Sequence, residues 1–374
     1  MLNGIRIIDF SNYLPGPFAS MRLADLGAEV IKVEPLEGDP ARVTGAKKNG
    51  TGLVYLANNR NKKSITLNLK EPEGKDIALQ LISKADVVLE SFRPGVMSKL
   101  GLGFHEAKEV NPNIVYCSIT GYGNENKLGS HDLNYMAVSG VLAQLKDMNG
   151  RPVHPSITLA DFYGGIAASE KILAGLVSRG KTGEGSYHCI SIADVMVSLM
   201  GNHLLYEQAT GYPSGVSVLN GEVVCYGLYE TSDNRYVSLG ALEKKFWTYF
   251  CLAVEREDLI EHHFSKTEES TSIYEEVKSL FKSKTLSEWI DFSMKVDCCL
   301  APVLETNELK EFPMFMSHLF ENGNGDRQVK MYSGFELPLS NLPPEKGEHS
   351  EEILTSILGA SEDQLTQWKN KGIF

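Results

Sequence analysis

A histidine and an aspartate in this chain, His131 and Asp161, are the residues best suited to move a proton on carbon. A neutral imidazole accepts a proton and a protonated carboxyl donates one. Two such groups on opposite faces of a substrate carbon can therefore remove a proton and return one. On spacing alone, however, a histidine near an aspartate is more often a structural hydrogen-bonded pair.

The surroundings of Asp161 leave two roles open for its carboxyl group. Asp161 falls between the apolar pair Leu159-Ala160 and the segment Phe162-Tyr163-Gly164-Gly165, which predicts a buried helix start. A carboxylate at a helix N-terminus is commonly a cap. Apolar neighbours would also raise its pKa and suit it to proton transfer.

The charge distribution offers a second functional feature, because the chain is acidic but carries one basic window. Its formal net charge is -12, which argues against nucleic acid and anionic membranes as partners. Residues 41–75 nevertheless hold eight basic and only two acidic side chains. Lysine and arginine in 58–64, just ahead of the strand-like stretch 65–69, could meet ligand phosphates. The alternative for this window is an ordinary solvated patch.

Alternating apolar elements predict an α/β fold that would position these residues. The order strand (5–10), helix (18–26), strand (30–33) is repeated by helices near 75–84 and 95–100 and by strands at 87–89 and 114–119. Such alternation indicates a parallel sheet covered on both faces, with ligands at the carboxyl ends of its strands. Beyond about residue 200 a hairpin over 226–239, closed by Asp233-Asn234, and an acidic helical stretch indicate a smaller α+β domain.

Several classes of site are absent from the sequence. It contains no GxxxxGK[ST], no GxGxxG after the first strand and no GxSxG. Its six cysteines form no CxxC pair, so neither a disulfide framework nor a metal site is expected. With no signal sequence recognised and no apolar stretch near the roughly 20 residues of a membrane span, we expect a cytoplasmic protein.

The segments around these residues resemble the family III CoA-transferase (CaiB/BaiF) superfamily over essentially the whole chain. The resemblance is carried by several ordered motifs: Asp9-Phe10 through Gly16-Pro17, the stretch 23–34, Asn61-Lys62-Lys63-Ser64-Ile65, the stretch from Ala85 through Gly95, Gly121-Tyr122-Gly123, the stretch 181–185 and Gly347-Glu348-His349-Ser350.

The resemblance implies an interlocked homodimer that acts on acyl-CoA thioesters and holds no permanently bound cofactor. It implies a large Rossmann-like, CoA-binding domain over 1–200, completed by about 326–374, and a small domain over 220–325. The basic window would then help to hold the CoA phosphates in an otherwise acidic protein.

Two reactions occur in this superfamily, and the resemblance assigns Asp161 a different role in each. In the transferases the matching aspartate attacks the thioester and forms an acyl anhydride, so that CoA passes between carboxylic acids. In the α-methylacyl-CoA racemases it is one of two acid/base groups, and the other is a histidine in a Gly-His-Asp-[Ile/Leu]-Asn-Tyr motif. That motif matches residues 130–135 except that Ser130 replaces glycine.

A racemase also has a glutamate that supports this histidine, and Gly240-Ala241-Leu242-Glu243 matches its motif. The pair His131 and Glu243 therefore favours a racemase or epimerase that inverts the α-carbon of 2-methylacyl-CoA thioesters through an enolate. A backbone N–H near Asp161 is the expected enolate donor. A CoA-transferase is the alternative, and a CoA-binding protein without catalysis is a third possibility. The sequence identifies neither the acyl group nor the pathway.

Further positions match CoA contacts in the family. Many relatives have arginine where this chain has Pro35, so the phosphate contact there would fall to Arg42 or be lost. The other expected contacts are Tyr13, Leu14, Pro15, Lys62, Lys63, Leu67, Lys70, Ser91, Phe92, Arg93 and Lys99, with Asp132 and Tyr135 near the pantetheine.

Overall fold

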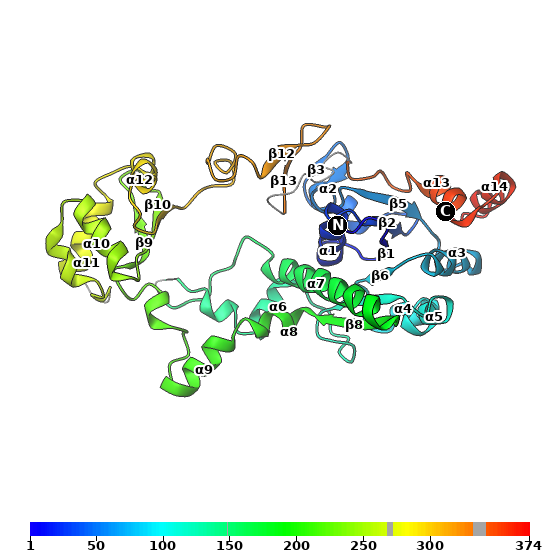
Figure 1. Ribbon diagram of the computed structural model, residues 1–374, viewed down its shortest axis with the longest axis horizontal. Coiled ribbons are helices and arrows are strands. Elements are labelled where there is room, and N and C mark those ends of the chain that lie inside the picture. The colour runs from blue at the N-terminus through cyan, green and yellow to red at the C-terminus, as the bar shows by residue number, and fades with distance from the viewer. Residues whose placement is uncertain (148, 268–271, 332–341) are drawn as a thin grey trace. The chain divides into compact units, whose positions relative to one another are not determined.

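Two units make up the chain in this computed structural model, which describes residues 1–147, 149–267, 272–331 and 342–374. The first unit comprises Met1–Met200 and Ser317–Phe374, so both chain ends contribute to it, and the second comprises Gly201–Met316. Figure 1 labels the elements of both units.

A six-stranded parallel sheet forms the centre of the first unit. Its strands are β1 (Arg6–Asp9), β2 (Glu29–Glu34), β5 (Lys62–Thr66), β6 (Val87–Glu90), β7 (Val115–Thr120) and β8 (Ser186–Ser191). They lie in the order β5-β2-β1-β6-β7-β8. The chain therefore builds outward from β1 on one side and then returns to build outward from β6 on the other. This confirms the predicted parallel α/β sheet and gives it a point of reversal between β1 and β6.

Helices cover both faces of this sheet (Figure 1). On one face Leu23 and Ile172, from α1 and α7, pack against Val87 and Val115 of the strands. On the other, Leu81 of α3 and Ile353 of α13 pack against Ile31. The helices of this unit are α1 (Pro15–Asp25), α2 (Leu53–Asn58), α3 (Pro72–Ser83), α4 (Val96–Leu100), α5 (Phe104–Val110), α6 (Asp132–Val138), α7 (Leu159–Thr182), α8 (Ile192–Ser198), α13 (Ser350–Leu358) and α14 (Glu362–Asn370). Short strand pairs β3 (Lys47–Lys48) with β4 (Thr51–Gly52), and β12 (Leu319–Glu321) with β13 (Arg327–Val329), complete it.

Two boundaries differ from the sequence prediction, and both matter for the site. Helix α1 begins at Pro15 rather than Phe18, because proline is tolerated in a first helical turn whose N–H groups lack partners anyway. Strand β5 begins at Lys62 rather than Ile65, so two of the predicted phosphate-binding lysines lie inside the sheet.

The second unit is built on the predicted hairpin. Strands β9 (Tyr226–Glu230) and β10 (Tyr236–Gly240) pair antiparallel, and β11 (Leu300–Pro302) adds a third strand. Its core includes Trp247, Phe281 and Trp289, from three helices of the acidic stretch. The helices of this unit are α9 (Gly201–Thr210), α10 (Lys244–Ala253), α11 (Ser272–Phe281) and α12 (Leu286–Ser293). Within the described ranges of both units, no helix is long and apolar enough to cross a membrane.

Candidate functional site

A cavity of about 680 Å³ lies in the first unit, at the carboxyl ends of β1, β6 and β7. Its walls come from the loops after β1 and β6 (residues 12–15 and 91–94), from the end of β7 with Gly121, from Asn126 and residues 128–131, and from the start of α7. The reversal of strand order between β1 and β6 parts the loops there, and ligands of open α/β sheets bind at such a point. The cavity lies where the sequence predicted a ligand site.

Asp161 lines this cavity from the first turn of α7. Burial, reinforced by the nearby charge of Asp132, raises the pKa of its carboxyl group to about 7. The backbone N–H of Asp161 donates to Oδ1 of Asp132 at 3.0 Å. At neutral pH the Asp161 carboxyl group is therefore divided between its acidic and basic forms. Its own N–H is already used, so an enolate donor at this helix start would have to be a neighbouring N–H.

His131 lines the same cavity from the N-cap position of α6. It is exposed, and its backbone N–H donates to Oδ1 of Asn134 at 3.0 Å, which fixes the chain at the start of the helix. Because α6 and α7 pack together, the two helix starts bring His131 and Asp161 to one cavity. The sequence proposed both residues but had no means of placing them together.

Ser130, the departure from the racemase motif, bonds to another residue of the motif. Its hydroxyl donates to the Tyr135 phenol oxygen at 2.9 Å, and both side chains pack against Gly121. A Cβ at Gly121 would lie 2.8 Å from each of these oxygens, so the two side chains would have to shift to admit a larger residue. The substitution therefore adds a hydrogen bond beside the cavity.

The predicted ligand residues divide into two groups in the structure. Those that line the cavity with His131 and Asp161 are Tyr13, Leu14, Pro15, Ser91, Phe92, Arg93 and Tyr135. Those outside the lining are Arg42, Lys62, Lys63, Leu67, Lys70, Lys99 and Asp132. Asp132 still contacts the site, through the backbone of Asp161. Among the cations, Arg93, Lys70 and Lys99 are exposed.

Lys62 has an internal role in place of the predicted phosphate contact. It is fully buried in β5, and its Nζ lies 3.3 Å from Oδ2 of Asp9. It donates to the Pro17 carbonyl oxygen at 2.9 Å and to Oδ1 of Asn59 at 2.8 Å. Burial lowers the pKa of Lys62 to about 7. With its ammonium group enclosed by these partners, Lys62 cannot reach a ligand in the cavity.

Arg42 and Lys63 also have acidic partners. Arg42 is buried, and its guanidinium binds the Glu34 carboxylate through two hydrogen bonds of 2.7 Å. Lys63 lies 2.9 Å from Glu352 and 3.2 Å from Glu29. The predicted transfer of the phosphate contact to Arg42 is thus at odds with the structure, because Glu34 neutralises its charge. Three basic side chains of the window, Arg42, Arg60 and Lys62, are paired with buried acids.

Glu243 belongs to the second unit, where it is exposed at the N-cap position of α10. Its support of His131 remains a prediction.

One residue that lines the cavity and one that supports its wall were not singled out from the sequence. Asn12 lines the cavity in the loop after β1. Glu90, the last residue of β6, is buried, and its carboxylate accepts the Phe92 N–H at 2.7 Å and a hydrogen bond from the Ser118 hydroxyl. Burial raises the pKa of Glu90 to about 7. The sequence could have indicated this residue, because an acidic side chain directly after the apolar run 87–89 lies at the end of a buried strand, where it can bind the backbone of the following loop.

Known proteins resemble this chain over its whole length. The profile of CoA-transferase family III matches residues 2–349. A succinyl-CoA:glutarate CoA-transferase of Homo sapiens is 30% identical, with 100% of this chain and 89% of that protein covered. An alpha-methylacyl-CoA racemase of Mus musculus is 31% identical, with 98% and 96% covered. A crystal structure of a CAIB/BAIF family protein from Brucella suis shares the fold, with a TM-score of 0.82 at 23% identity over 95% of this chain and 99% of that one.

Proposed function

Because this chain belongs to CoA-transferase family III, a family of enzymes that includes both transferases and racemases, we propose that it is an acyl-CoA racemase or epimerase. The observation that carries the proposal is the meeting of His131 and Asp161 on one cavity, with the Asp161 pKa raised to about 7. A group divided between acid and base forms at neutral pH is suited to both halves of a proton transfer.

The proposed reaction is a 1,1-proton transfer on a 2-methylacyl-CoA. His131 or Asp161 takes the proton α to the thioester carbonyl, and the electron pair of the C–H bond moves into an enolate. Hydrogen-bond donors of the cavity hold the enolate oxygen. The opposite group then gives its proton to the other face of the carbon. Exchange of protons with water resets the pair, so no co-reactant is consumed.

The CoA part of the substrate would lie across the loops after β1 and β6. Arg93 on the cavity wall and the exposed Lys70 and Lys99 are the cations available for its phosphates. We further propose a homodimer in a reducing cytoplasm, where the six unpaired cysteines of the structure would be stable.

Isotope exchange tests the reaction directly. Each enantiomer of a 2-methylacyl-CoA is incubated in deuterium oxide, and deuterium at the α-carbon and inversion of configuration are measured separately. Wild-type enzyme should produce both. His131→Gln should abolish inversion and leave exchange in only one enantiomer, whose proton faces Asp161. His262→Gln, at an exposed histidine of the second unit, is the control that should behave as wild type.

The transferase alternative predicts the opposite outcome. Asp161 would attack the thioester, CoA would leave, and hydroxylamine would trap the resulting anhydride as a modified Asp161. Absence of α-exchange together with acyl transfer to a free carboxylic acid would replace the racemase with a CoA-transferase. Binding of CoA thioesters without either reaction would indicate a binding protein.

A further inference from the structure

The loop between β1 and α1 reaches the cavity in a strained form. Tyr13 has a φ of 63°, in the left-handed region that a non-glycine residue adopts at a cost. Its neighbour Asn12 lines the cavity. Surrounding groups must therefore hold the loop in this conformation.

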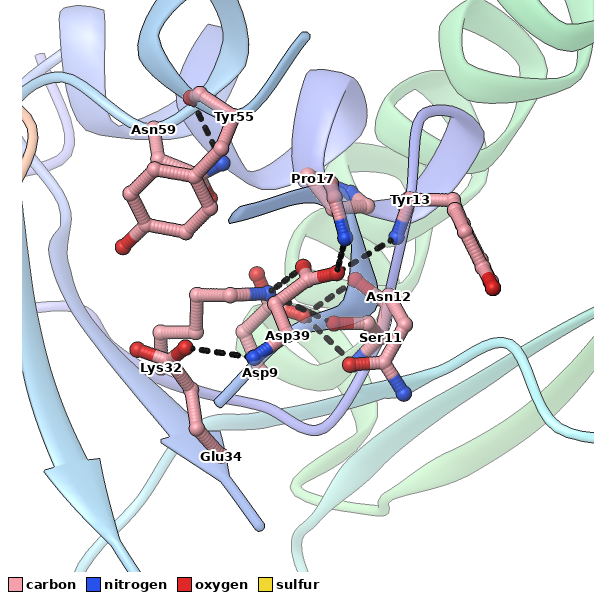
Figure 2. Close-up of polar contacts among 12 residues, drawn as sticks. Asp9, Ser11, Asn12, Tyr13, Pro17, Lys32, Glu34, Asp39, Tyr55 and Asn59 are labelled. Atoms are coloured by element: carbon pink, nitrogen blue, oxygen red, sulfur yellow. Dashed lines mark hydrogen bonds and ion pairs between the residues drawn. The ribbon is translucent and has the colours of Figure 1, made fainter. Parts of the chain in front are cut away.

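Buried charged groups hold the backbone on both sides of Asn12 (Figure 2). The Lys32 ammonium donates to the Ser11 carbonyl oxygen at 2.7 Å. The Asp39 carboxylate accepts the Tyr13 N–H at 3.1 Å. Lys32 and Asp39 also pair with each other at 2.8 Å, and both side chains are completely buried. The peptide groups before and after Asn12 are thus bound to two halves of one ion pair.

A third contact fixes Asn12 itself. Its backbone N–H donates to the Ser91 hydroxyl at 3.1 Å, which joins the loop after β1 to the loop after β6. Although burial opposes it, the charges of Asp39 and Asp9 hold the pKa of Lys32 above its usual range. Lys32 therefore stays charged at neutral pH and keeps both its pairing with Asp39 and its hydrogen bond to the Ser11 carbonyl.

The Asn12 side chain, in contrast, lacks a partner. Its Oδ1 is buried and makes no hydrogen bond to any residue that the structure describes. Buried polar atoms are nearly always bonded, and an unbonded one costs about 1–3 kcal/mol. Because Asn12 lines the cavity, rotation of its carboxamide would present this oxygen to a bound ligand, which can supply the missing bond. Pantetheine, with two amide groups, carries both donors and acceptors that suit a carboxamide.

We propose that Asn12 is a further substrate-binding residue of this cavity, and that Lys32 and Asp39 are the positioning residues that present it. The inference rests on the proposed function, because the ligand is the amide-bearing arm of a CoA thioester. Neither Lys32 nor Asp39 lines the cavity itself. Such a buried pair contributes little net stability relative to apolar residues of the same size, so its geometric effect on the loop is the stronger reason for its presence.

Binding of isobutyryl-CoA tests the role of Asn12. This probe has the α-methyl branch but no stereocentre, so turnover leaves it unchanged, and calorimetry measures its Kd. Asn12→Ala should raise the Kd roughly fivefold to tenfold, as expected for the loss of one hydrogen bond. Asn113→Ala, at an exposed asparagine away from the cavity, should leave it unchanged. An unchanged Kd in Asn12→Ala would overturn the inference.

A pair of double variants tests the positioning role. Lys32→Met/Asp39→Asn removes both charges at nearly constant volume, and the asparagine oxygen can still accept the Tyr13 N–H. The matched control is Arg60→Met/Asp25→Asn, a buried pair at 2.5 Å that bonds to Asn61 and Gln328. We expect similar losses of Tm, with a Kd increase of roughly fivefold only in the first variant. Equal Kd values in the two variants would reduce the Lys32–Asp39 pair to a structural role and contradict the inference.

These outcomes separate the inference from the proposed function. If wild-type protein binds no isobutyryl-CoA, the proposed function fails, and the inference falls with it. If wild type binds and Asn12→Ala binds equally well, the inference alone fails.

Discussion

Burial changes the chemistry of Asp161. An exposed aspartate is fully ionised at neutral pH and is a weak base. In the first turn of α7, burial of the carboxyl group and the charge of Asp132 raise its pKa to about 7. The residue can then both accept and donate a proton at neutral pH, and it does so on the cavity that His131 also lines.

The pH profile should distinguish the two reactions at this residue. A racemase needs one of Asp161 and His131 protonated and the other deprotonated, so kcat/KM should pass through a maximum and fall on both sides, with one limb set by Asp161 near pH 7. A transferase needs ionised Asp161, so its kcat/KM should rise up to about pH 7 and then level off. Asp132→Asn removes the like charge and should move the Asp161 limb to lower pH. An unmoved limb would contradict the assignment of that limb to Asp161.

The free energy of unfolding should depend on pH as a consequence of this raised pKa. Because the folded-state pKa of Asp161 lies above its unfolded value of 3.8, the carboxyl group costs increasing stability as pH rises from about 4 to about 7, and a constant amount above that. One pKa unit corresponds to about 1.4 kcal/mol, and partial solvent access reduces the total. Asp161→Asn should therefore raise the free energy of unfolding at pH 8 by about 2 kcal/mol, with no gain at pH 4, in urea titrations. A gain independent of pH would refute this origin.

Helix α7, which carries Asp161, packs closely against α1. At Gly165 a Cβ would lie 2.6 Å from the Pro15 carbonyl oxygen and 2.9 Å from Phe18. The same Pro15 lines the cavity. Gly165 therefore allows the helix that carries Asp161 to approach the start of α1, where Pro15 follows the loop that contains Asn12.

Two glycines of α7 provide a matched test. Gly165→Ala should force α7 away from α1, lower the free energy of unfolding by about 1–3 kcal/mol and reduce activity. Gly180→Ala adds the same methyl group where nothing lies within 4 Å. It should stabilise the helix by up to about 1 kcal/mol and leave activity unchanged. Equal effects of the two substitutions on thermal unfolding and turnover would contradict the close-approach explanation.

At the scale of the whole molecule, the predicted catalytic groups are divided between two units. His131 and Asp161 belong to Met1–Met200, whereas Glu243 belongs to Gly201–Met316. The residues that line the cavity all belong to the first unit. Substrate binding and proton transfer should therefore respond differently to changes in the second unit.

Substitution of Glu243 should separate the two activities. Glu243→Gln should lower the kcat of racemisation about 100-fold, since general acid–base catalysis is worth that much or more, and should leave the Kd of isobutyryl-CoA unchanged. The control Glu261→Gln alters an exposed ion pair with Lys244 in the same unit and should change neither. A kcat for Glu243→Gln equal to that of wild type would remove Glu243 from the mechanism.

The alternation of apolar runs with turns was sufficient to predict the parallel sheet, because strand and helix periods are local properties of the chain. The same reasoning directed attention to the loops after β1, β6 and β7, which form the cavity. Residue types were sufficient to propose His131 and Asp161. Each of these conclusions depends on neighbours in the sequence.

The partners of the basic window were decided only by the tertiary structure. Strand periodicity shows that Lys62 and Lys63 point to opposite faces, but not which face is enclosed. The sheet order β5-β2-β1 brings Lys62 to Asp9, and the loop after β2 brings Asp39 to Lys32. A charged side chain in a low-dielectric interior must find an opposite charge. Charge counted along the sequence shows that such pairs are available, whereas only the folded chain determines which charges are neutralised inside and which remain free for a ligand.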